Sequence, residues 1–104
     1  MELMRGLISR LNKELRKAKA EEQQQAIIAK YAAMSAIQTI AYGSVYTVED
    51  MIKNIENKVL SHKDGYAFYW DSENKKETDV RMSFNIDKIK EKAYKYEYII
   101  WHIK

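Results

Sequence analysis

The chain has 104 residues, of which 46% are hydrophobic and 32% charged, and it contains neither cysteine nor proline. A chain of this length builds one small domain, and its composition is that of an ordered domain rather than a disordered one. The absence of cysteine excludes disulfides and thiolate metal sites. No run of about 18 uncharged apolar residues is present, so no membrane span is expected.

The charge is concentrated at the N-terminal end. Residues 1–20 carry six basic and two acidic side chains, a net +4, and the other residues carry twelve basic and thirteen acidic ones, a net −1. Together they give the +3 of the whole chain. The N-terminal segment also lacks the apolar core of a secretory signal, so we expect a cytoplasmic protein.

The first segment is an amphipathic helix by its spacing. Leu7, Leu11 and Leu15 fall on one face at helical intervals, and basic residues fall on the rest. Residues 19–25 hold only good helix formers and no cap, and Gly43 is a residue suited to a left-handed helix end. The pattern predicts one unbroken helix over residues 3–41, about 55–60 Å long. The alternative is a helical hairpin with its turn near residues 23–25.

The second half of this segment, residues 26–41, is apolar nearly all round and rich in alanine. It offers more apolar surface than one small sheet and one short helix can cover, and small residues let another backbone approach closely. We therefore expect a homodimer. Its predicted interface consists of Ala29, Ala33, Ala36 and Ile37.

The remaining chain predicts two helices and three strands. Thr47, with Asp50 three residues later, begins a helix that continues to about residue 63, and Asn85 caps a short helix over residues 86–94. Residues 66–71, 78–84 and 96–104 have strand patterns. A hairpin joins the first two, and the apolar first strand suits the centre of an antiparallel sheet ordered 2-1-3.

The predicted fold class is therefore α+β, with element order α-α-β-β-α-β and a three-stranded antiparallel sheet. We expect a single domain over residues 1–104. In it, residues 1–41 form a projecting and dimerising helical element and residues 44–104 form the α+β body.

Motifs of catalysis and cofactor binding are weak or missing. The three glycines are scattered and form no phosphate loop, and His62 and His102 are isolated in the sequence. Asp71, Glu73 and Lys75 fit a loose D-x-E-x-K nuclease pattern, but they fall in a predicted turn. We expect no catalytic residue, no metal and no cofactor, and hence a protein that is not an enzyme.

Two sets of residues are candidates for binding a partner. The first is the basic face of the N-terminal helix. It has three interpretations: a solvated face, a phosphate-binding face, or a contact for an acidic protein or a membrane surface. Its members are Arg5, Arg10, Lys13, Arg16 and Lys17. The second is an aromatic set on the sheet, which fills the core, forms a protein interface or stacks on bases. Its members are Tyr69, Trp70, Tyr96, Tyr98 and Trp101.

These features favour a small non-enzymatic interaction or inhibitor protein that binds a larger protein or nucleoprotein partner. By class alone, with no motif in support, such chains resemble the inhibitors of phages and mobile elements, including anti-CRISPR proteins. The alternative is a nucleic-acid-binding protein that uses the basic helix for phosphate contacts.

Overall fold

The computed structural model describes the backbone of residues 2–18 and 20–104, and side chains from Gly6 onward except at residue 19. Its elements, in chain order, are α1 (Glu2–Lys17), α2 (Glu21–Ile40), β1 (Ser44–Thr47), α3 (Val48–Glu56), β2 (Gly65–Asp71), β3 (Lys76–Arg81), α4 (Ile86–Lys92) and β4 (Tyr98–Ile103). The predicted α+β class is confirmed. No described helix has the length and apolar character that crossing a bilayer requires.

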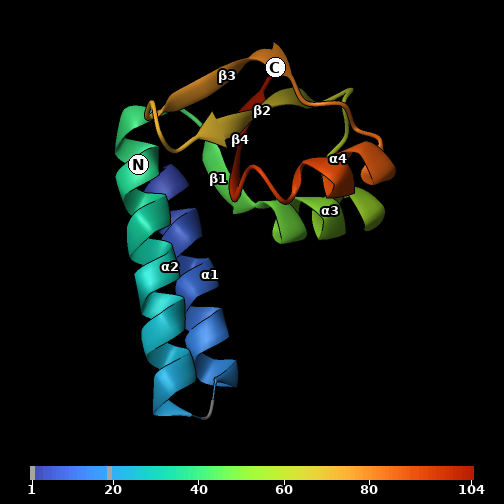
Figure 1. Cartoon of the computed structure of the whole chain (residues 1–104). Coiled ribbons are helices and arrows are strands. Elements are labelled where there is room, and N and C mark those ends of the chain that lie inside the picture. Colours follow the sequence, from blue (N-terminus) through green and yellow to red (C-terminus); the bar gives the residue numbers. More distant parts are fainter. Residues whose placement is uncertain (1, 19) are drawn as a thin grey trace.

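The predicted unbroken helix is wrong, and the alternative, a helical hairpin, is what forms. The chain reverses direction between Lys17 and Glu21, a few residues before the turn that we expected, and α1 and α2 lie side by side (Figure 1). The molecule is 38 Å in its longest dimension. A straight helix would have left the apolar face of α1 exposed to water. The reversal instead packs Leu7 and Leu11 with Tyr31 and Met34.

The sheet has four antiparallel strands in the order β1-β4-β2-β3, one more than predicted. The predicted arrangement of the other three is confirmed, because β2 lies between β3 and β4. The additional strand, β1, pairs residues 44–47 with residues 98–101 of β4. The strand has only four residues and the last of them, Thr47, is also the N-cap of α3, so we assigned this segment to the helix and missed the pairing.

The central strand β4 is buried on both faces of the sheet, whereas the edge strand β3 is mostly exposed. Tyr98 and Ile100 of β4 point to one face and join the core beneath α1 and α2, with Tyr31 and Met34. Ile99 and Trp101 alternate with them and join the core beneath α3 and α4. The protein therefore has three layers, with the hairpin and the α3–α4 pair on opposite faces of one sheet.

Local caps fix the two shorter helices. Thr47 accepts a hydrogen bond from the backbone N–H of Asp50, and Asn85 accepts from the N–H groups of Asp87 and Lys88. The α3 helix ends earlier than predicted, because Lys58 adopts a φ of 60° in a Schellman motif. In that motif the N–H groups of Lys58 and Val59 donate to the carbonyls of Ile55 and Asn54.

Gly43 does not take the left-handed conformation that we expected, since no glycine has a positive φ among the described residues. Its role is to permit a close approach between the end of α2 and β4. A Cβ built at this position would lie 2.7 Å from the carbonyl oxygen of Trp101. The glycine therefore lets the hairpin join the sheet at its β1 edge.

Candidate functional site

The outer side of α1 holds the exposed part of the predicted basic face. Lys13, Arg16 and Lys17 are exposed and fall within one sector of about 100° of the helix. Among the side chains that the structure describes, no carboxylate forms an ion pair with any of them. Arg5 lies outside the residues whose side chains are described. The three cations form what we call the basic face below.

Arg10, the fifth member of the predicted set, is turned inward. Its Nη2 donates a 2.7 Å hydrogen bond to the carbonyl oxygen of Val45, and its guanidinium carbon lies 4.5 Å from the centre of the Tyr46 ring. These contacts connect α1 to the edge strand β1 and use the cation inside the fold. Arg10 is therefore a structural contact between the hairpin and the sheet, because its charge is not free to meet a partner.

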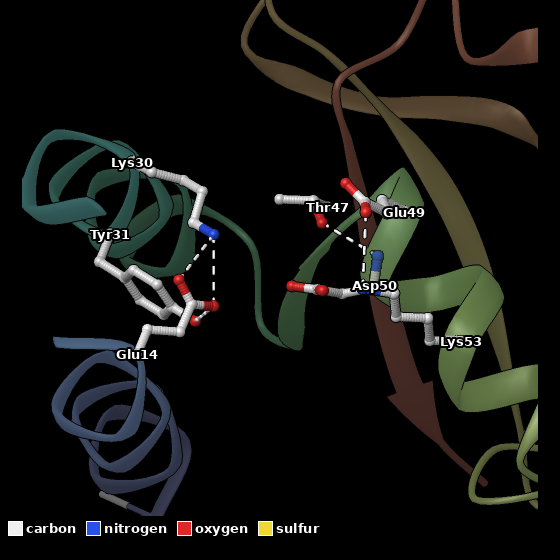
Figure 2. A network of polar contacts seen from close by, with 7 residues as sticks. All are labelled: Glu14, Lys30, Tyr31, Thr47, Glu49, Asp50 and Lys53. Carbon is white, nitrogen blue, oxygen red and sulfur yellow. Dashed lines mark hydrogen bonds and ion pairs between the residues drawn. The ribbon is translucent and has the colours of Figure 1, made fainter. Parts of the chain in front are cut away.

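A polar network connects α1 to α2 beside the basic face (Figure 2). The Glu14 carboxylate accepts hydrogen bonds from the Lys30 ammonium at 3.0 Å and from the Tyr31 hydroxyl at 2.8 Å. Partial burial opposes ionisation of Glu14, but the two hydrogen bonds and the nearby charges of Lys30 and Arg10 outweigh it and lower its pKa. Burial, followed by the Glu14 contact, raises the pKa of Tyr31.

A polar cleft of about 420 Å³ separates this network from the start of α3, as Figure 2 shows. Glu14 and Lys30 line its hairpin side, and Thr47, Asp50 and Glu97 are among the residues that line the body side. Across the cleft, Lys53 pairs with Glu49 at 3.5 Å, one turn apart on α3. Each of the two lysines on the walls is paired with a carboxylate of its own wall, whereas Asp50 and Glu97 form no ion pair among the described residues, so the cleft carries an excess of negative charge.

The predicted aromatic set is packed inside the protein. Tyr69, Trp70, Tyr98 and Trp101 are each at most 8% exposed, and the half-buried Tyr96 stacks on Tyr69 with ring centres 4.9 Å apart. Burial raises the pKa of Tyr69 and of Tyr98. Of the three interpretations of these residues, packing in the core is the one that the structure supports. The physical reason is the second helical layer, which covers the sheet face that a two-layer fold would leave open.

The predicted dimer residues divide into two groups. Ala29, Ala33 and Ala36 are exposed on α2, on the side away from the sheet. Ile37 is 8% exposed and belongs to the core beneath the hairpin. Residues one helical turn apart lie on the same face of a helix, and Ile37 follows Met34, the most deeply buried residue of α2, by one turn. Ile37 therefore points toward the sheet.

One cluster was not expected from the sequence. His102 on β4 pairs with Glu77 on β3, stacks on Tyr66 with ring centres 5.3 Å apart, and meets Phe68 edge-on. The guanidinium carbon of Arg81 lies 4.4 Å from the centre of the Tyr66 ring. His102 is therefore surrounded by side chains of β2 and β3. The sequence could not show this, because the neighbours follow from the strand register, which pairs His102 with Tyr66.

The nuclease-like pattern is a turn. The Asp71 carboxylate accepts hydrogen bonds from the backbone N–H groups of Glu73 and Asn74 and from the Asn74 side chain. These bonds, the Asn74 side chain first among them, lower the pKa of Asp71. Among the residues that the structure describes, no three His, Asp or Glu side chains are placed to hold a metal ion. The carboxylate of Asp71 thus serves the hairpin between β2 and β3.

Comparison with protein-family models, curated proteins and solved structures found no match for this chain.

Proposed function

We propose that this protein is a small, non-enzymatic interaction protein that occupies a surface of a larger protein partner, as small inhibitors do. The observation that carries the proposal is the basic face of α1. Lys13, Arg16 and Lys17 stand together on the outer helix of the hairpin, and no described carboxylate pairs with them. Unpaired cations in one sector favour a partner with an acidic surface.

Two features of the structure support a binding surface in this place. Arg10, the neighbouring cation on α1, is fixed to the sheet by its bond to Val45, so the helix is held against the body. Lys17 also lines a shallow groove with Ala18 and Ile27 at the tip of the hairpin, where apolar area lies beside the charge. Charged residues around a small apolar surface are typical of protein interfaces.

The test is to capture the partner with tagged protein from the native host, with and without nuclease treatment. The basic-face variant replaces Lys13, Arg16 and Lys17 with glutamate, which changes the net charge from +3 to 3 − 6 = −3. A matched control replaces the exposed Lys63, Lys76 and Lys88 with glutamate and reaches the same net charge. We expect capture of a nuclease-resistant protein partner by the wild type and the control, and its loss in the basic-face variant.

Salt dependence separates the alternative function, nucleic-acid binding, from the proposed one. Counterion release makes binding to a polyanion fall by orders of magnitude between low and physiological salt. Capture that nuclease abolishes, with such a salt dependence, would replace the proposal with the nucleic-acid alternative. Equal capture by the basic-face variant and the control would show that the partner binds elsewhere.

A further inference from the structure

The exposed side of α2 is free of charge over four turns. The exposed residues of this helix from Ala26 onward are Ala26, Ile28, Ala29, Ala32, Ala33, Ala36, Thr39 and Ile40. The one charged residue in this stretch, Lys30, is half-buried and pairs with Glu14 on the other side of the helix. Ile28 and Ile40 are 51% and 55% exposed. A helix that faces only water normally carries charges there.

The first helix extends this surface. Ile8 on α1 is 52% exposed, and together with Leu11 it lines a shallow apolar groove of about 180 Å³ whose other wall contains Ile28 and Ala32. The groove follows the seam between the two helices. We call this surface, formed by Ile8, Leu11, Ile28, Ala29, Ala32, Ala33 and Ala36, the apolar side of the hairpin.

The geometry points to a second copy of this chain as the occupant of the apolar side of the hairpin, which makes the protein a homodimer joined through its helices. The stretch of α2 whose exposed side is free of charge, residues 26–40, is about 22 Å long, and two packed helices are about 18 Å wide. Two such faces bury about 800 Å², which is the size of a small, reversible interface. Two hairpins joined in this way form a four-helix bundle.

The charges of α2 favour an antiparallel contact between the two α2 helices. Glu21 and Glu22 are exposed in its first turn, and its last turn holds no basic residue. A parallel pair would place four carboxylates together, whereas an antiparallel pair separates them by about the length of the helix, 30 Å. With the two-fold axis between Ala32 and Ala33, Ala29 of one copy lies opposite Ala36 of the other.

This arrangement is independent of the proposed function. The basic face lies about 80–180° round α1 from Ile8, so both copies keep it exposed. Alanines at the centre of the contact allow the two backbones to approach closely, and the isoleucines lie toward its edges. The same stripe serves both copies, as a two-fold interface requires.

The first experiment is sedimentation equilibrium of the full chain at concentrations up to about 1 mM, because an interface of this size is a weak one. We expect a dimer of twice 12.3 kDa, or 24.6 kDa, for the wild type. Ala33→Glu should give a monomer with an unchanged circular dichroism spectrum, because Ala33 is exposed within one copy. Ala93→Glu, a matched change at an exposed position on the opposite side of the sheet, should remain a dimer.

Disulfide cross-linking tests the contact without a disruptive substitution. The chain has no cysteine, so single-cysteine variants react only at the chosen position. An equimolar mixture of Ala29→Cys and Ala36→Cys should cross-link at least several-fold faster than either variant alone, and Ala93→Cys should not cross-link. This assay also decides the matter if Ala33→Glu fails to fold.

A wild type that stays monomeric up to about 1 mM would overturn the inference, and so would a dimer that survives Ala33→Glu with its fold intact. Faster cross-linking of Ala29→Cys by itself than in the mixture would overturn the antiparallel contact. None of these results depends on the larger partner, so failure of the dimer and failure of the proposed function are distinguishable.

Discussion

The hydroxyl of Tyr31 on α2 donates a 2.8 Å hydrogen bond to the carboxylate of Glu14 on α1. Tyr31 is buried, so its hydroxyl needs a partner, and Glu14 supplies one while it also pairs with Lys30. The bond joins two helices that have no cap between them to specify the reversal. It therefore fixes how the two helices face each other.

Replacing Glu14 with glutamine should measure what this contact contributes. We expect the free energy of unfolding to fall by about 1–2 kcal/mol, because the charge-assisted bonds to Tyr31 and Lys30 become neutral or are lost. The control is Lys53→Gln, which breaks the exposed pair with Glu49 and should cost less than about 0.5 kcal/mol. Urea unfolding of both variants gives the comparison, and equal losses would contradict it.

The pH dependence of stability should reflect the same carboxylate. Folding lowers the pKa of Glu14 below its ordinary value of 4.5. Its contribution to stability is therefore fully present above that value and is lost as the pH falls through the folded pKa. The difference in unfolding free energy between wild type and Glu14→Gln should shrink between about pH 6 and pH 3. Urea titrations across this range would measure it, and a constant difference would refute the assignment.

Two isoleucines of β4 offer a matched test of the core. Ile99 is fully buried in the cluster beneath α3 and α4, whereas Ile103 is 76% exposed at the end of the same strand. Ile99→Ala should lower the free energy of unfolding by about 2–5 kcal/mol, because it leaves a cavity. Ile103→Ala should cost less than about 1 kcal/mol. Similar midpoints of chemical unfolding for the two variants would contradict this placement of the sheet.

Two glycines should respond to alanine in opposite directions. A Cβ at Gly65 would lie 2.2 Å from the carbonyl oxygen of His102 and 2.6 Å from the Trp101 ring, so Gly65→Ala should destabilise the protein by about 1–3 kcal/mol. Gly6 lies in α1 with nothing within 4 Å of the added carbon. Gly6→Ala should stabilise by about 0.5–1 kcal/mol. Thermal melts would show the two shifts, and a stabilised Gly65 variant would disprove the close approach.

Two lysine-to-glycine changes near the end of α3 should shift the melting temperature in opposite directions. Lys58 has a φ of 60° in the Schellman motif, a conformation that costs a non-glycine residue about 1 kcal/mol. Lys58→Gly should therefore raise the melting temperature. Lys53→Gly, in the helix itself, should lower it, because glycine in a helix costs about 1 kcal/mol. The two melting temperatures should lie on either side of the wild-type value.

Features that depend on neighbouring residues could be predicted from the amino-acid sequence alone. Thr47 and Asn85 cap their helices through bonds to the next few backbone N–H groups, so each cap could be read from a few residues. The strand patterns of residues 66–71, 78–84 and 96–104 likewise predicted β2, β3 and β4, and the residues of β2, apolar on both faces, predicted its interior position in the sheet.

Features that join distant segments depend on long-range packing and could not be predicted from local sequence. Residues 17–21 contain no local signal to stop a helix, and the reversal there forms because it brings Leu7 together with Tyr31 in one core. Arg10 does not belong to the exposed basic face because it donates a hydrogen bond to Val45. That partner is 35 residues away in the sequence, so no local pattern predicts the contact. The β1 strand forms because its backbone pairs with β4 at the edge of the sheet. Local propensities differ by tenths of a kcal/mol per residue, whereas burying one large side chain contributes about 1.5–3 kcal/mol, so long-range packing decides where local signals are weak.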